Sequence, residues 1–178
     1  MRLIVAAACV LAPASAYAVD YMSAEQAARS IFPDAQRFEA RDLKLDSSQM
    51  QQLSSRRIQA RSAVWSLQVA RRGETTLGYV VVDAVIGKFE LITYAVGVRI
   101  DGSVAQVEIL SYRESHGYEI RNAAWRKQFV GKSSSSALRV GEDIANISGA
   151  TLSCEHVTQG IRRVVNVIDV AQQSGALP

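Results

Sequence analysis

An alternation of apolar and polar side chains with a period of two residues runs through most of residues 63–112. This period places successive side chains on opposite faces of a strand, so it argues against a helix in this range. Turn residues break the alternation at residues 71–74, at Gly87-Lys88 and at Asp101-Gly102. Connections this short join antiparallel neighbours, and the pattern therefore predicts a meander of four consecutive strands.

Helical patterns flank the predicted sheet on both sides. Ser23 stands where an N-cap is expected, and apolar residues at helical spacing follow it until Pro33. Helices are predicted over residues 23–32, 42–59 (starting at Ser47 or Ser48), 121–129 and 152–172. The predicted fold class is α+β: an antiparallel meander sheet of about four strands with flanking helices, in a single domain.

The first 18 residues have the features of a secretory signal peptide. Arg2 precedes an apolar stretch, and Ala16-Tyr17-Ala18 has the small-x-small pattern of a cleavage site. Nothing after residue 18 approaches the ~20 apolar residues that a membrane-spanning helix needs. We therefore expect a signal peptide at 1–18, an N-terminal helical segment at 19–62 and a domain at 63–178, exported as a soluble periplasmic or envelope-associated protein.

Charge and cysteine content exclude several classes of function. Cleavage removes Arg2 from the 20 basic residues, so 19 basic and 17 acidic residues leave a formal charge of +2. This charge is too small to argue for nucleic acid as a partner. Cys154 becomes the single cysteine, so the core must be stable without an intramolecular disulfide. His116 and His156 have no Cys or acidic partner at metal-ligand spacing, and no metal site is predicted.

Basic residues form four pairs along the chain: Arg56-Arg57, Arg71-Arg72, Arg126-Lys127 and Arg162-Arg163. The pairs are interpreted as solvated surface. The alternative is a docking face or a cradle for an anionic cofactor.

A loop of small residues opens onto the last predicted helix. Ser148-Gly149-Ala150-Thr151 and Leu152-Ser153 precede apolar residues at helical spacing, beginning with Val157. Free N–H groups and the positive end of the helix dipole lie at such a place, which can therefore hold a phosphate. The alternative is an ordinary capped helix with Thr151 or Ser153 as the N-cap.

A second candidate loop follows the last predicted strand. Residues 113–119 combine a glycine, a histidine, an aromatic side chain and two acids. A helical pattern with Trp125, Gln128, Phe129 and Gly131 comes next.

These motifs together resemble the FMN-binding domain family, which includes the C and G subunits of sodium-pumping NADH:quinone reductase and Rnf complexes. Ser148-Gly149-Ala150-Thr151 is similar to the family's Ser/Thr-Gly-Ala-Thr flavinylation motif. Glu114-Ser115 and Gly117 resemble its Glu-Thr-Pro-Gly loop, with His116 in the place of proline. Residues 125–131 are similar to its Trp-x-x-Gln-Phe-x-Gly segment, and the likeness covers roughly residues 77–168.

The resemblance implies that the Thr151 hydroxyl carries FMN through a phosphoester, installed from FAD by a flavin transferase with magnesium. It implies an FMN-binding domain at 63–178 and membrane or envelope redox partners. The implied cofactor-binding residues are Thr151, Ser148, Gly149, Ala150, Leu152, Ser153, Glu114, Ser115, His116, Gly117 and Tyr118. The family usually has an aspartate six residues before the acceptor, where this chain has Ala145; the nearest acid is Asp143.

The function implied is an exported electron-transfer flavoprotein, a carrier rather than an enzyme with its own substrate. One alternative is an exported flavin-dependent reductase of a small acceptor, which turnover with an isolated acceptor would support. The other is a flavin-free binding or scaffold module of the same fold, which Ala145 in place of the aspartate favours.

Overall fold

The computed structural model describes residues 21–178; the predicted signal peptide at 1–18 lies outside the described residues. In chain order the elements are α1 (Ala24–Ile31), β1 (Arg37–Lys44), α2 (Ser47–Ser55), β2 (Val64–Arg72), β3 (Thr75–Ile86), β4 (Leu91–Arg99), β5 (Val104–Ser111), the 3-10 helix η1 (Tyr118–Arg121), α3 (Ala123–Arg126), the 3-10 helix η2 (Lys127–Phe129) and α4 (Thr151–Gln173). Among the described residues, no helix has the length and apolar character needed to cross a membrane.

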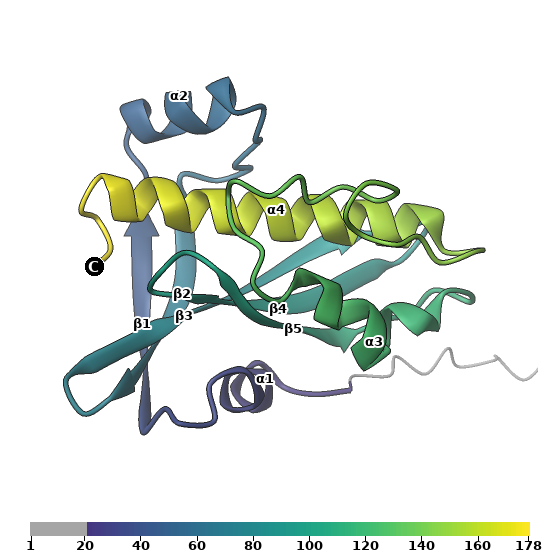
Figure 1. Cartoon of the computed structure of the whole chain (residues 1–178), viewed down its shortest axis with the longest axis horizontal. Coiled ribbons are helices and arrows are strands. Elements are labelled where there is room, and N and C mark those ends of the chain that lie inside the picture. Colours follow the sequence, from purple (N-terminus) through teal and green to yellow (C-terminus); the bar gives the residue numbers. More distant parts are fainter. Residues whose placement is uncertain (1–20) are drawn as a thin grey trace, which may run out of the picture.

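The strands form one open antiparallel sheet in the order β1-β2-β3-β4-β5, so each strand pairs with its neighbour in sequence (Figure 1). The predicted α+β class and the antiparallel meander are confirmed, and β2 to β5 follow the four segments of two-residue alternation. The predicted helices at both ends are also present as α1 and α4. The structure adds a fifth strand, β1, at the sheet edge.

The added strand lies in the segment 19–62, which we expected to be helical. Leu43 is the buried residue of β1, and its other side chains are exposed or half-buried, so the strand carries almost no apolar alternation. Pairing with β2 holds it in place. The Glu39 carboxylate also contacts the guanidinium groups of Arg71 at 2.8 Å and Arg37 at 2.7 Å. Cross-strand contacts rather than local pattern therefore determine this element.

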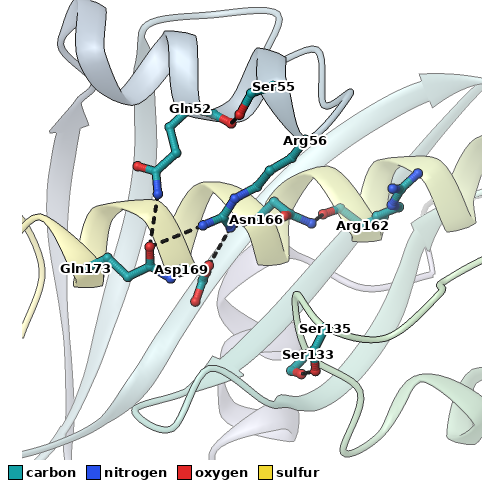
Figure 2. Close-up of polar contacts among 9 residues, drawn as sticks. All are labelled: Gln52, Ser55, Arg56, Ser133, Ser135, Arg162, Asn166, Asp169 and Gln173. Carbon is teal, nitrogen blue, oxygen red and sulfur yellow. Dashed lines mark hydrogen bonds and ion pairs between the residues drawn. The ribbon is translucent and has the colours of Figure 1, made fainter.

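Helix α2 begins at Ser47, one of the two predicted starts, while residues 42–44 of the predicted segment belong to β1. Its N-cap is Asp46, whose side chain accepts a hydrogen bond from the Gln49 N–H. At the other end Arg56 reaches across to α4 (Figure 2), where its guanidinium lies 2.5 Å from the Asp169 carboxylate.

Two apolar clusters cover the two faces of the sheet. Helix α4 packs on one face and α1 on the opposite face (Figure 1). The larger cluster joins α4 to the sheet and to the segments after β5, and it includes Tyr94, Ile161 and Ile168. The smaller cluster joins Ile31 and Phe32 to the outer face of the strands. With α4 packed along the sheet, its N-terminus lies beside the β3–β4 turn and the loop after β5.

Candidate functional site

A pocket of about 400 Å³ lies at the N-terminus of α4. It is formed by the β3–β4 turn, the loop after β5 and the loop that leads into α4. The residues that line it are Lys88, Phe89, Glu114, Ser115, His116, Gly149, Ala150, Thr151, Leu152 and Ser153. The structure thus brings both candidate loops together, although more than 30 residues of sequence separate them.

Helix α4 starts without a side-chain cap. Its N-cap residue is Ala150, and the first helical residue is Thr151. The capped-helix alternative is therefore wrong for both residues that it named, since Ser153 is buried inside the first turn, 3.2 Å from the Tyr112 hydroxyl. An uncapped start leaves N–H groups of the first turn without a side-chain acceptor, and a bound phosphate can supply one.

The Thr151 side chain lies at the surface of this helix start. Its hydroxyl oxygen accepts a hydrogen bond from the Asn146 side-chain amide at 3.0 Å. Gly149 has a φ of +82°, and nothing lies within 4 Å of the position that a Cβ would take there. The space beside Gly149 is therefore open, and Gly149 and Thr151 both line the pocket.

The loop after β5 packs directly against the loop before α4. Gly117 has a φ of +85°, and a Cβ on it would lie 2.3 Å from the Ala150 Cβ. The Tyr112 hydroxyl donates a hydrogen bond to the His116 carbonyl and so holds the same loop from beneath. Glycine is needed here both for the left-handed backbone and for the close approach.

Glu114 ties the loop after β5 to the β3–β4 turn. Its Oε1 accepts hydrogen bonds from the N–H groups of Phe89 at 2.7 Å and Glu90 at 3.0 Å. Burial opposes ionisation of this carboxyl, but the backbone N–H groups of Glu90 and Phe89 outweigh burial and lower its pKa. The Glu114 charge is therefore satisfied within the protein, and it shapes the rim of the pocket.

The remaining candidates differ in their position. Ser115 and His116 line the pocket and are exposed, with the Ser115 hydroxyl 2.9 Å from the His116 Nδ1. Ser148, Gly117 and Tyr118 do not line it, and Tyr118 is 62% exposed.

Two pocket residues, Lys88 and Phe89, were not among the candidate site residues, because Gly87-Lys88 was interpreted as a break between strands. The Phe89 side chain is 74% exposed, and the Lys88 ammonium lies 4.9 Å from the centre of its ring. The available signal was a large aromatic residue directly after the predicted Gly87-Lys88 turn. Leu152, 42% exposed, adds apolar surface on the α4 side.

The Trp125–Gly131 segment holds the backbone that leads to the site. The Trp125 indole N–H donates to the Ala145 carbonyl at 2.8 Å, and the Gln128 side-chain oxygen accepts from the Ala145 N–H at 2.7 Å. Trp125 is buried and packs edge-to-face on Phe129, with ring centres 5.1 Å apart. The Trp125 and Gln128 side chains therefore both hold the backbone of Ala145, the position where the family has its aspartate.

Asp143, the acidic residue nearest to Ala145, has a structural role. One of its oxygens lies 2.9 Å from the Lys132 ammonium, and both accept backbone N–H groups, from Leu138 and Arg139. Burial raises the pKa of this carboxyl, but the Arg139 N–H and Lys132 outweigh burial and lower it. Asp143 anchors the loop that follows Lys132 and does not replace the aspartate absent at position 145.

Cys154 and His156, the other residues with reactive side chains near the start of α4, have structural contacts. Cys154 is fully buried, and burial raises the pKa of its thiol, so it is a packed residue of the core. His156 Nδ1 lies 2.7 Å from the Ile86 carbonyl and ties α4 to the end of β3. Residues 21–178 contain no group of three or more His, Cys, Asp or Glu side chains placed to hold a metal ion.

Fold and site together define a class of protein: an α+β domain with an open pocket at an uncapped helix N-terminus that suits a phosphate-bearing ligand. Residues 87–166 match the family model of the FMN-binding domain, which supports an FMN-binding domain in this part of the chain. The matched range begins at the β3–β4 turn and ends within α4, and it includes every segment that lines the pocket. No match was found among the curated proteins.

Proposed function

We propose that this protein is an exported electron-transfer flavoprotein that carries FMN covalently, through a phosphoester on the Thr151 hydroxyl. The observation that carries the proposal is the exposed Thr151 side chain at the uncapped start of α4, inside the matched flavin-binding range. The covalent bond, the site residues and export are proposals that rest on this observation and on the sequence motifs.

The start of α4 supplies what a phosphoester anion needs. N–H groups of the first turn can donate charge-assisted hydrogen bonds to its oxygens, and the helix dipole contributes about 0.3–1 kcal/mol at an exposed site. Attachment from FAD would join Thr151 Oγ1 to the flavin-side phosphorus and break that phosphorus's bond to the bridging oxygen. AMP then leaves with the bridging oxygen, and the hydroxyl proton passes to a base of the transferase.

The pocket beside Thr151 has the size and surface for one flavin. A volume of about 400 Å³ falls in the range of sites for single small-molecule ligands. Phe89 and Leu152 present apolar surface, and Lys88 adds a positive charge. When bound, FMN would supply reversible electron transfer, and Phe89, Leu152 and Lys88 would position it and shield one side of it from water.

A carrier role suits this pocket better than an enzyme with its own substrate. The Thr151 loop, the Glu114 loop and the β3–β4 turn form a single hollow, which one flavin would occupy. The proposed partners are a flavin transferase for maturation and redox proteins of the membrane or envelope. A reductase of a small acceptor remains the second candidate, and catalytic turnover of an isolated ferric chelate or quinone by the flavinylated protein would favour it.

The deciding experiment is co-expression with an active flavin transferase, followed by intact mass measurement. The wild type is expected to gain one FMN-phosphoryl group. Thr151→Val removes the hydroxyl at an exposed position and keeps β-branching, so a folded protein without flavin is expected. Ser54→Ala, which removes an exposed hydroxyl outside the pocket, is the matched control and should flavinylate normally.

Two results would contradict the proposal. Covalent flavin on the Thr151→Val protein would show that the acceptor is another residue. A wild type that stays unmodified beside an active transferase would exclude covalent attachment and favour the scaffold alternative.

A further inference from the structure

A larger pocket lies beside the middle of α4, away from the proposed flavin site. We propose that this pocket binds a small organic anion through carboxylate or phosphate groups. It has a volume of about 600 Å³ and lies between the α2–β2 linker, the loop around residue 139 and one side of α4. It shares no lining residue with the pocket at Thr151, so the proposal is independent of the flavin function.

Positive charge dominates the pocket lining. Arg57, Arg139, Arg162 and Arg163 line it, with Glu155 as the acidic residue. Arg163 is paired with Asp83 at 2.8 Å, and Arg139 with Glu142 at 3.2 Å. Two of the four guanidinium groups thus already have a carboxylate partner.

The other two arginines have guanidinium groups free for a ligand. Within residues 21–178, neither Arg57 nor Arg162 makes a side-chain hydrogen bond or ion pair. Figure 2 shows the contrast with Arg56, whose guanidinium contacts Asp169 and Gln173 while that of Arg162 lies apart from this cluster. Adjacent arginines in the sequence therefore have different roles.

Two buried polar atoms of the same pocket also lack partners. In the described part of the chain, the Thr158 hydroxyl and the Arg163 Nε have no hydrogen-bond partner, although these residues are only 1% and 7% exposed. Buried polar groups are rarely left unpaired, and each such case calls for an unseen partner. Arg163 and Thr158 both line the pocket, so a small side-chain movement would bring these atoms into contact with a ligand oxygen.

Backbone strain occurs on both rims of the pocket. Arg57 has a φ of +60° and Leu138 a φ of +46°, left-handed values that are uncommon for residues other than glycine. Strained residues concentrate at ligand sites, where the surroundings hold them. Strained backbone, free guanidinium groups and unpaired buried atoms therefore occur together at this pocket.

The donor set indicates the chemical class of the ligand. Guanidinium groups bind carboxylate and phosphate alike through paired hydrogen bonds. The volume exceeds that of a single inorganic anion and falls in the range of small-molecule sites. Pyrophosphate and citrate represent the two anion classes and serve as probes.

The test is isothermal titration of the purified protein with pyrophosphate and, separately, with citrate at low ionic strength. Saturable binding of one equivalent is expected for at least one probe. Arg162→Gln and Arg57→Gln should each weaken binding about tenfold or more, the loss expected for a charge-assisted hydrogen bond. Arg72→Gln removes the same charge from an exposed position outside the pocket and should leave affinity unchanged.

Thr158→Val gives an independent readout that does not change charge. It should weaken binding and, without ligand, raise the melting temperature, because it removes an unpaired buried hydroxyl and keeps the shape. Pyrophosphate binding would assign the site to phosphates and citrate binding to carboxylates; either supports the proposal. Absence of millimolar or tighter binding for both probes would overturn it. So would equal weakening by Arg72→Gln, or unchanged affinity in Arg162→Gln.

Discussion

Thr151 differs from the neighbouring serines in what surrounds its hydroxyl. The Ser153 hydroxyl is buried against Tyr112, whereas Thr151 is exposed and receives the Asn146 amide. Because that amide occupies one lone pair of the oxygen, it orients the side chain and leaves the hydroxyl proton free to be removed. These contacts support the proposal that Thr151, rather than Ser153, is the FMN acceptor.

We predict that Asn146→Ala slows flavinylation of Thr151 without changing the fold. The Asn146 side chain is exposed and makes its hydrogen bond to the acceptor oxygen, so its loss should affect orientation more than stability. The expected result is a several-fold slower gain of flavin mass with the transferase and an unchanged melting temperature. An attachment rate equal to that of the wild type would show that the amide has no orienting role.

Glu114 gives a prediction for the pH dependence of stability. Its pKa is lower in the folded protein, so its stabilising contribution is present above the unfolded value of ~4.3 and is lost as pH falls through the folded value. Glu114→Gln should lower stability near pH 7 by about 1 kcal/mol after allowance for solvent screening. The gap in melting temperature should close below about pH 4. A difference in melting temperature between Glu114→Gln and the wild type that does not vary with pH would show that the Glu114 charge does not stabilise the folded protein.

At the scale of elements, the site depends on close contact between two loops. Gly117 lets the loop after β5 touch Ala150 at the start of α4, and Glu114 joins the same loop to the β3–β4 turn. Trp125 and Gln128 hold Ala145 in the segment that leads to the site. Each family motif outside the Ser-Gly-Ala-Thr sequence thus positions a part of the pocket.

We predict that Gly117→Ala destabilises the protein more than Gly131→Ala does. Both glycines have φ near +80°, but a Cβ on Gly131 meets nothing within 4 Å, whereas one on Gly117 overlaps Ala150. The backbone penalty of about 1–2 kcal/mol is common to both, and overpacking adds about 1–3 kcal/mol at Gly117 alone. Urea unfolding measures the difference, and equal losses would argue against the close contact.

At the scale of the whole molecule, the N-terminal segment belongs to the folded unit. Helix α1 covers the sheet face opposite α4, and β1 extends the sheet (Figure 1). Residues 87–166, the matched range, contain neither of these elements. The folded unit therefore extends beyond the matched range.

We predict that Phe32→Ala costs about 3–5 kcal/mol of unfolding free energy, because its ring is buried between α1 and the sheet. Phe89→Ala is the matched control: its ring is 74% exposed, so the change should be within about 0.5 kcal/mol. Urea denaturation of both variants checks the comparison. A small loss in Phe32→Ala would show that the α1 layer is dispensable.

The sequence by itself determined the elements whose signal is local. The two-residue alternation of β2 to β5, the helical spacing of α4 and the Ser148–Thr151 motif are all contained in short stretches, so they could be predicted without coordinates. The edge strand β1 could not, because its side chains are mostly exposed and its position depends on pairing with β2.

Tertiary structure alone decided how the site is assembled. The pattern of hydroxyl residues suggested Thr151 or Ser153 as the N-cap, yet packing of Ser153 against Tyr112 and of Ala150 against Gly117 leaves α4 uncapped. The roles of Phe89 and the difference between Arg56 and Arg162 likewise depend on contacts with distant segments. Such contacts could not be predicted from local sequence, because they join distant segments that are brought together only when the helices pack on the sheet.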